Sequence, residues 1–278
     1  MASEVLVYLD GDFVPWSRAT VPVEDRAMQF GDSVYEVIRY YNGEPFRLER
    51  HLDRLVRSAE GILLPLPPLD EIRGAITELI DRQGLRDASV YLQVTRGSGP
   101  RSHLLPAEPK PYTIAIARPA PIVRPRAPIA AITASDDRWA RCYLKTTMLL
   151  PNTLARERAR RCGADDAIFI RDGFVTEATA SNVFIVVDGG LVTPPLSNYI
   201  LPGITREVVL ELARQEGIPC AEVPVPAESL DRADEIMLSG TLSEVTAVVG
   251  LDGRPVGSGQ PGPVFQKLGA AFDRLIGL

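Results

Sequence analysis

The chain has 278 residues, of which 45% are hydrophobic and 24% charged, a balance typical of a globular protein with one large core or two smaller ones. Its formal net charge of -6 argues against a nucleic acid or an anionic membrane as partner. Neither an apolar run of the ~20 residues that cross a bilayer nor a secretory signal is visible, so we expect a cytoplasmic protein.

Hairpin signals open the chain. The runs V-L-V-Y-L and F-V flank Asp10-Gly11, and the runs Y-E-V-I-R-Y-Y and P-F-R-L flank Asn42-Gly43. Both dipeptides are typical of two-residue turns between antiparallel strands. Apolar residues at helical spacing then predict a helix over about 48–63 and a second over about 69–83, which Gly84 closes.

Two further strands, S-V-Y-L-Q-V-T-R and P-Y-T-I-A-I-A, are joined by a loop over 97–111 that is rich in Gly, Pro and Ser. The segment 118–128 follows and contains four prolines, which exclude a helix interior. It is the natural linker between two domains. We therefore expect an N-terminal domain over 1–118, a linker over 119–127 and a C-terminal domain over 128–278.

The second half repeats the mixture of helices and hairpins. We expect a helix over about 147–162, hairpins that turn at Asp172-Gly173 and Gly189-Gly190, a helix over 204–215, strands near 221–225, 235–238 and 245–249, and a terminal helix. Because hairpins dominate over strand-helix-strand alternation, the fold class is α+β or mixed α/β. The first domain is the smaller, and the second contains a largely antiparallel, barrel-like sheet.

The number and spacing of the cysteines and histidines argue against a disulfide framework and a metal centre. Cys142, Cys162 and Cys220 are widely spaced and include no C-x-x-C, so they indicate reduced thiols and not a disulfide framework. His51 and His103 are too few for most metal centres, and we expect no metal site.

Lysine is rare in this chain. Of the 30 basic residues, 27 are arginines, and the lysines are Lys110, Lys145 and Lys267. Arginine can replace lysine in most ion pairs, but it cannot form a Schiff base, because its guanidinium stays protonated. Lys145 lies between apolar neighbours in R-C-Y-L-K-T-T-M-L-L, and desolvation favours the neutral amine that such a bond requires. A surface lysine at a helix start is the ordinary alternative.

Two kinds of segment could bind a cofactor. In V-T-E-A-T-A-S-N-V-F, Glu177 ends a strand and could face a cofactor, although a polar hairpin connection explains it equally. L-P-G-I-T-R and S-G-T-L place a glycine and a threonine before a helix and after a strand, where free N–H groups suit a phosphate. The ordinary alternative is that the glycine and threonine only cap a helix. Arg54 could add positive charge, or it could be an exposed helical arginine.

The loop T-R-G-S-G-P-R-S-H spaces Arg101 and His103 two residues apart. In an extended loop both side chains point the same way, and together they could bind a carboxylate. A solvated loop arginine is the alternative.

Taken in order, these segments resemble one family. E-D-R-x-x-Q-F-G-D-S-V-Y-E-V, H-L-D-R-L-x-x-S-A-E, Y-L-Q-V-T-R-G-x-x-P-R-x-H, D-R-W-A-R-C-x-x-K, V-T-E-x-x-x-S-N-V-F, G-I-T-R-x-V-V and S-E-V-T are similar to motifs of the fold-type IV pyridoxal-phosphate aminotransferases. The match is strongest with the D-amino-acid aminotransferases and covers nearly the whole chain.

The resemblance implies a two-domain homodimer that binds pyridoxal 5'-phosphate between its domains and moves amino groups from D-amino acids to 2-oxo acids by a ping-pong mechanism. Lys145 would bind the cofactor covalently and shuttle the proton. The cofactor would also contact Glu177, Arg54, Ile204, Thr205, Gly240, Thr241 and Thr179. Tyr35, Arg101 and His103 would bind the substrate carboxylate, the last two reaching in from the partner subunit. Glu36, Arg138 and Ser181 would lie around these contacts.

Four alternatives stay open. The same fold carries branched-chain L-amino-acid aminotransferases and aminodeoxychorismate lyases, and an R-selective amine transaminase side activity depends on pocket shape. A non-enzymatic relative would be expected to lack Lys145 or Glu177, and both are present. The chain departs from the family pattern after the carboxylate, where it has Thr179 and Ala180 instead of a run of serines, and at Gly240, which replaces a residue with a hydroxyl beside Thr241. These changes remove one or two possible hydrogen bonds to the cofactor, each worth ~1 kcal/mol.

Overall fold

The computed structural model describes residues 5–278. The chain forms two compact units. The first runs to Ile122 and also takes in Leu144–Met148, and the second comprises Val123–Tyr143 and Leu149–Leu278. Lys145 therefore belongs to the first unit, although it lies in the second half of the sequence.

The first unit contains an antiparallel sheet of strand order β2-β1-β6-β5-β3-β4. The hairpins predicted at Asp10-Gly11 and Asn42-Gly43 are confirmed, and all four turn residues have positive φ, as a type I′ turn requires. The strands are β1 (Leu6–Leu9), β2 (Asp12–Pro15), β3 (Ser33–Tyr41), β4 (Glu44–Pro45), β5 (Ala88–Thr95) and β6 (Tyr112–Pro119).

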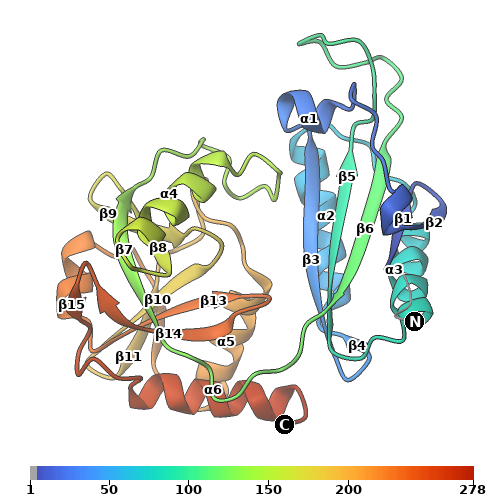
Figure 1. The fold of residues 1–278 in the computed structure, drawn as a ribbon. Helices are drawn as coiled ribbons and strands as arrows, with labels where there is room; N and C mark the ends of the chain where they lie inside the picture. Colours follow the sequence, from blue (N-terminus) through green and yellow to red (C-terminus); the bar gives the residue numbers. More distant parts are fainter. Residues whose placement is uncertain (1–4) are drawn as a thin grey trace. The chain divides into compact units, whose positions relative to one another are not determined.

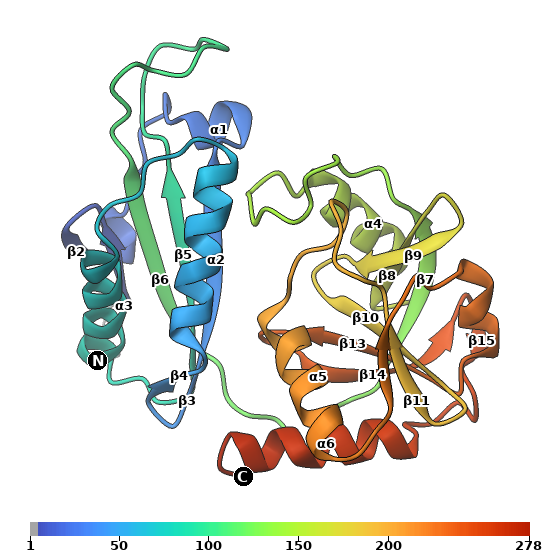
Figure 2. The ribbon, with the colours of Figure 1, turned by 180° about the vertical axis from the view of Figure 1, so that it is seen from behind.

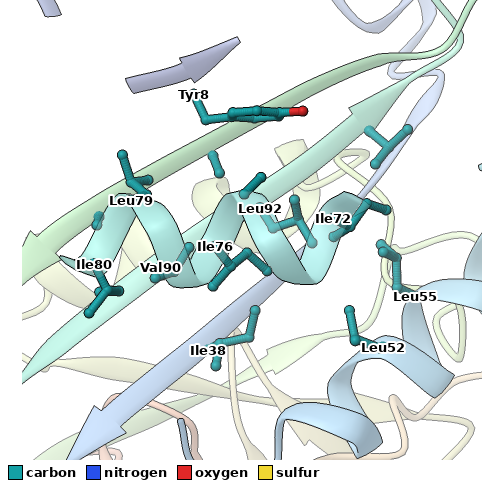
Figure 3. Packing of buried hydrophobic residues seen from close by; sticks show 14 of the residues in the cluster. Tyr8, Ile38, Leu52, Leu55, Ile72, Ile76, Leu79, Ile80, Val90 and Leu92 are labelled. Atoms are coloured by element: carbon teal, nitrogen blue, oxygen red, sulfur yellow. The ribbon is translucent and has the colours of Figure 1, made fainter. Parts of the chain in front are cut away.

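Two helices, α2 (Leu48–Gly61) and α3 (Leu69–Gln83), cover one face of this sheet (Figures 1 and 2). Both were predicted from apolar spacing, and Gly84 ends α3 in the left-handed conformation, with φ of 61°. Figure 3 shows apolar side chains of the two helices packed against apolar side chains of the strands. The helix residues are Leu52, Leu55, Ile72 and Ile76, and the strand residues are Ile38, Val90 and Leu92. A short helix that was not predicted, α1 (Arg26–Phe30), precedes β3, and Asp25 caps it by accepting a hydrogen bond from the Ala27 N–H at 2.8 Å.

The second unit contains a mixed sheet of order β12-β11-β10-β13-β14-β7-β8-β9, with β15 paired to β14. Most pairings are antiparallel, as expected, but β7 runs parallel to both β14 and β8, and β11 runs parallel to β12. The strands are β7 (Ile129–Ser135), β8 (Asp166–Arg171), β9 (Phe174–Ala178), β10 (Asn182–Val187), β11 (Gly190–Thr193), β12 (Cys220–Glu222), β13 (Glu235–Gly240), β14 (Glu244–Leu251) and β15 (Arg254–Pro255).

Three expectations for this unit need correction. The strand β7 was not predicted, because its partners are distant in sequence and it directly follows the proline-rich segment. The hairpin expected at Gly189-Gly190 turns one residue earlier, at Asp188-Gly189, whose φ angles are 50° and 74°. The strand expected over 221–225 is β12 and ends at Glu222.

The helices of the second unit are α4 (Leu150–Arg161), α5 (Ile204–Gln215) and α6 (Pro263–Leu275). The bounds of α5 match the prediction, and Figure 2 shows α5 beside α6. α4 begins later than the expected residue 147, because Thr147 is held against β3 by a hydrogen bond from its N–H to the Ser33 carbonyl at 3.2 Å. Within residues 5–278, no helix combines the length and apolar character that crossing a bilayer requires.

Candidate active site

Lys145 lies on a short extended segment paired with β3. The Tyr35 N–H donates to the Lys145 carbonyl at 3.0 Å, and the Lys145 N–H donates to Ser58 Oγ of α2 at 3.0 Å. Its backbone is thus fixed by a strand and a helix, which positions a side chain better than a free loop does. The ammonium Nζ lies 4.3 Å from the centre of the Tyr35 ring, and Lys145 is half-buried.

The Tyr35 ring is itself supported by a second tyrosine. The Tyr35 and Tyr91 rings stack with centroids 5.6 Å apart, and the Tyr91 hydroxyl donates to Gln93 Oε1 at 2.8 Å. Burial raises the pKa of Tyr91 to about 12, so this phenol stays neutral. The Tyr35 ring, supported by Tyr91, therefore limits the positions that the Lys145 amine can occupy.

Glu36, His51 and Arg54 form a buried ionic cluster between β3 and α2. Glu36 accepts from Arg54 Nε at 2.7 Å and from Arg54 Nη2 at 2.8 Å, and it lies 2.8 Å from His51 Nδ1. Burial alone would raise the pKa of Glu36, but the charges and hydrogen bonds of Arg54 and His51 lower it to about 2. The pairing is bidentate, so it fixes the plane of the Arg54 guanidinium. Sequence reasoning missed His51, although it shares a face of α2 with Arg54 at a spacing of three.

Glu36→Gln is expected to reduce the loss of stability in acid. Because the pKa of Glu36 is lowered from 4.5 to about 2, the carboxylate stabilises the folded state above pH 4.5, and this contribution disappears as pH falls towards 2. The shift corresponds to about 3 kcal/mol at neutral pH. Urea unfolding at a series of pH values should show the variant less stable near neutrality and less sensitive to acid. Glu60→Gln, an exposed site on the same helix, is the control; equal acid sensitivity of wild type and Glu36→Gln would contradict the account.

Glu177 lies in the second unit, near the end of β9. It is 6% exposed, and Oε2 accepts from the Leu201 N–H at 2.9 Å and from Asn182 Nδ2 at 3.4 Å, while Oε1 accepts from Arg138 Nη1. Burial raises the pKa of Glu177 to about 7, against the lowering effect of Arg138. A carboxyl of this pKa can take up or release a proton near neutral pH.

Asp136 holds Arg138 in place. It accepts from Arg138 Nε and from Arg138 Nη2, each at 2.8 Å, and it also accepts from the Thr176 hydroxyl at 2.9 Å. Burial by itself raises the pKa of Asp136, but Arg138, Arg171 and Thr176 lower it to about 2. Arg138 therefore bridges a carboxylate that stays ionised and one that titrates near neutrality. Sequence reasoning missed Asp136; its only local signal is the D-x-R spacing to Arg138.

Two glycine turns in the second unit present hydrogen-bond donors. At Gly203, before α5, an added Cβ would lie 2.0 Å from Asn182 Oδ1, so the close approach requires glycine. The N–H groups of Ile204 and Thr205 open this 12-residue helix, and such a terminus suits a phosphate. At Gly240, an added Cβ would lie 2.9 Å from Ser243 Oγ and 3.1 Å from Ser181 Oγ. Thr241 and Ser243 lie on the turn between β13 and β14, and Ser181 lies between β9 and β10.

These groups fit pyridoxal 5'-phosphate by their chemistry. Backbone N–H groups, hydroxyls and a fixed guanidinium suit its phosphate, the Lys145 amine suits its aldehyde, and the Glu177 carboxyl suits its ring nitrogen. Thr179 differs from the other expected cofactor ligands. Its hydroxyl donates to Asp166, and its carbonyl accepts from Asn152 Nδ2 at 2.8 Å. In this structure Thr179 thus supports the turn.

Arg101 and His103 lie together on the exposed loop between β5 and β6, which extends past the strand ends beside α1 (Figure 1). The Arg101 guanidinium is 5.1 Å from the centre of the Phe30 ring, and the His103 ring is 5.6 Å from it. The structure therefore brings the side chains of these two residues to the Phe30 ring.

The expected site residues are divided between the two units. The first unit contains Lys145, Tyr35, Glu36, Arg54, Arg101 and His103, and the second contains Glu177, Arg138, Ser181, Ile204, Thr205, Gly240 and Thr241.

The chain is similar to known proteins over nearly its full length. Residues 33–251 match the amino-transferase class IV family. The chain is 40% identical over 274 residues to a D-alanine aminotransferase of Staphylococcus haemolyticus, covering 97% of each protein, and 40% identical over 275 residues to that of Bacillus licheniformis, covering 97% of this chain and 96% of the other.

Solved structures give a similar picture. A branched-chain amino acid aminotransferase of Escherichia coli has a TM-score of 0.91 at 32% identity, over 99% of this chain and 95% of that one. Another branched-chain amino acid aminotransferase, which was solved with pyridoxamine 5'-phosphate, has a TM-score of 0.91 at 29% identity, over 100% of this chain and 96% of that one. These comparisons confirm the family inferred from the motifs and the mixed α/β fold class.

Proposed function

The chain belongs to the amino-transferase class IV family, whose members depend on pyridoxal 5'-phosphate, and we propose that it moves the amino group of D-amino acids to 2-oxo acids. D-alanine and D-glutamate represent the donors. The observation that carries this choice is the identity to D-alanine aminotransferases, which exceeds the identity to the branched-chain enzymes. The Arg101 and His103 pair adds support, because we expect branched-chain enzymes to lack it.

Lys145 is the proposed catalytic amine. When bound, the cofactor supplies an electron sink for negative charge at the substrate α-carbon. Lys145 Nζ takes the α-proton of the D-amino acid in the first half-reaction. In the second half-reaction it delivers a proton to the carbon of the incoming 2-oxo acid. One amino acid and one 2-oxo acid are thus exchanged for another such pair, in a ping-pong sequence.

The other groups bind and orient. Glu177 would hold a proton in common with the ring nitrogen, and Arg138, fixed by Asp136, would keep that carboxyl in place. The proposed phosphate contacts include one arginine that Glu36 orients. These are Arg54, Ile204, Thr205, Gly240 and Thr241, with Ser181 and Thr179 as neighbours of the cofactor.

Tyr35, Arg101 and His103 are proposed to bind the substrate carboxylate, with Arg101 and His103 supplied by the second subunit of a homodimer. The exposure of both loop residues supports this assignment. Mixing Lys145→Ala subunits with Arg101→Ala subunits tests it. Shared sites predict that the mixture regains activity at low substrate concentration, because a heterodimer combines an intact Lys145 with an intact Arg101. A mixture no more active than its components would place the loop in its own subunit's site.

A panel of D- and L-amino acids with 2-oxoglutarate as acceptor tests the function itself. The proposal expects D-alanine to be converted to pyruvate only when 2-oxoglutarate is present. Equal or faster turnover of L-leucine would instead select the branched-chain activity, which the solved relatives favour. Pyruvate released from aminodeoxychorismate without an acceptor would select a lyase.

We also propose the domain limits 1–118 and 128–278 with a linker over 119–127. The division of the chain at Ile122 and Val123 supports a boundary in that linker. Limited proteolysis should cut there first. The unpaired Cys142, Cys162 and Cys220 support a location in the cytoplasm, which cell fractionation would test.

A further inference from the structure

The base of the Arg101–His103 loop is fixed by Asp25 and Arg26, at the start of α1. The Arg26 N–H donates to the Gly97 carbonyl at 3.0 Å, and Asp25 and Ser98 form an isolated antiparallel bridge. Gly97 has φ of 85°, and an added Cβ would lie 1.9 Å from the Lys110 carbonyl oxygen. The two ends of the loop therefore meet where only glycine fits, and the start of α1 forms one side of this closure.

The Arg26 side chain reaches further along the loop. It is 5% exposed, and its Nη1 donates at 2.8 Å to the carbonyl of Ser102, the residue between Arg101 and His103. Its Nε donates at 2.8 Å to Asp32 Oδ2, which also accepts from Arg96 Nε at 2.8 Å. Burial raises the pKa of Asp32 on its own, but Arg96 and Arg26 lower it below its usual value, so the anchor stays charged.

Phe30, four residues after Arg26 on the same helix, contacts the two functional side chains. The Arg26 guanidinium carbon lies 4.6 Å from the centre of its ring, and that of Arg101 lies 5.1 Å from it. The His103 ring meets it edge-on at 5.6 Å. Arg26 therefore holds the loop backbone between the two residues, while Phe30 contacts both of their side chains.

We propose that Arg26 and Phe30 are positioning residues that hold Arg101 and His103 in the geometry needed to bind the substrate carboxylate. The inference rests on the proposed role of those two residues. A bidentate arginine contact tolerates displacements of only about 0.5 Å, and an exposed loop does not keep such a geometry unaided. Arg26 supplies a buried, charged link from the loop backbone to Asp32, so the loop adopts its binding geometry before the substrate arrives.

The test compares Arg26→Ala with Arg101→Ala and with the double variant. We expect Arg26→Ala to raise KM for D-alanine and for 2-oxoglutarate about tenfold, with kcat and the visible absorbance of the bound cofactor unchanged. In the Arg101→Ala background, Arg26→Ala should raise KM much less than tenfold, because only His103 is left for it to position. Hydrogen exchange of the amides over 97–105 should accelerate in Arg26→Ala. Arg26→Lys should raise KM less than Arg26→Ala does, because lysine can still contact Asp32.

Arg82→Ala is the matched control, since Arg82 also lies over a phenylalanine ring of the same unit, with its guanidinium 4.2 Å from the centre of Phe13. If Arg101→Ala raises KM but Arg26→Ala does not, the positioning role is overturned and the proposed function stands. A full additional effect of Arg26→Ala in the Arg101→Ala background also overturns it. Unchanged KM in Arg101→Ala removes the carboxylate-binding role itself. Should Arg26→Ala fail to fold, Phe30→Leu decides by the same KM and exchange measurements.

Discussion

Lys145→Arg is expected to lower kcat by about 10³-fold or more, since arginine keeps the charge and length but can neither bond to an aldehyde nor accept the α-proton. Main-chain hydrogen bonds to Tyr35 and Ser58 hold the segment and do not depend on the side chain, so the variant should fold. Borohydride reduction of the wild-type holoenzyme, followed by peptide mapping, should label Lys145, and the variant should carry no label.

The chain has three lysines, so the labelled peptide can be assigned to one of three side chains. Lys267→Arg is the matched control, because Lys267 is exposed and donates to the Glu216 carbonyl on the surface. It should retain wild-type kcat and wild-type labelling. Label on Lys110 or Lys267 of the wild-type protein would remove Lys145 from the reaction, and with it the proposed chemistry.

Glu177→Gln is expected to lower kcat by about 10²-fold, because glutamine cannot share a proton with the ring nitrogen as a carboxyl does. The loss of a buried charge usually destabilises the fold strongly, since its partner is left unpaired. Here Arg138 retains two hydrogen bonds to Asp136, so the variant should fold and its defect should be chemical. Steady-state kinetics and cofactor titration would measure the two effects separately.

The titration of Glu177 can be followed directly in the cofactor-free protein. Carbon NMR of labelled glutamate carboxyls should show one resonance that titrates near its pKa of about 7 and that is missing in Glu177→Gln. Glu157→Gln, at a surface site on α4, should keep this resonance and wild-type kcat. A Glu177→Gln enzyme within twofold of wild-type kcat would show that the carboxyl does not serve the ring.

In each unit a buried carboxylate holds an arginine that is close to the proposed cofactor contacts. In the first unit Glu36 fixes Arg54, and in the second Asp136 fixes Arg138, which in turn contacts Glu177. In each case a buried acid whose pKa is lowered to about 2 holds an arginine by two hydrogen bonds. The groups proposed to touch the cofactor therefore depend on carboxylates that stay ionised well below neutral pH.

Local sequence signals predicted the elements that local physics determines. Asp-Gly and Asn-Gly pairs gave the hairpin turns, because few other residues accept two successive positive φ angles. Apolar spacing and a terminal glycine gave α3 with its bounds. The strand β7 was missed, since its neighbours β14 and β8 are separated from it by long stretches of chain, and parallel pairing leaves no turn signature.

The sequence by itself determined which chemistry is available. A rare lysine among apolar residues, a strand-end carboxylate and glycines before N–H donors are properties of residue types and spacing. Only the tertiary structure decided which charges meet: Leu144–Met148 pairs with β3 instead of starting α4, and Arg138 contacts Glu177. Short-range spacing cannot specify these contacts, because they arise from the packing of segments far apart in the chain. Burial in that packing raises the pKa of Glu177 to about 7, whereas at Glu36 the paired Arg54 and His51 outweigh burial and lower the pKa to about 2.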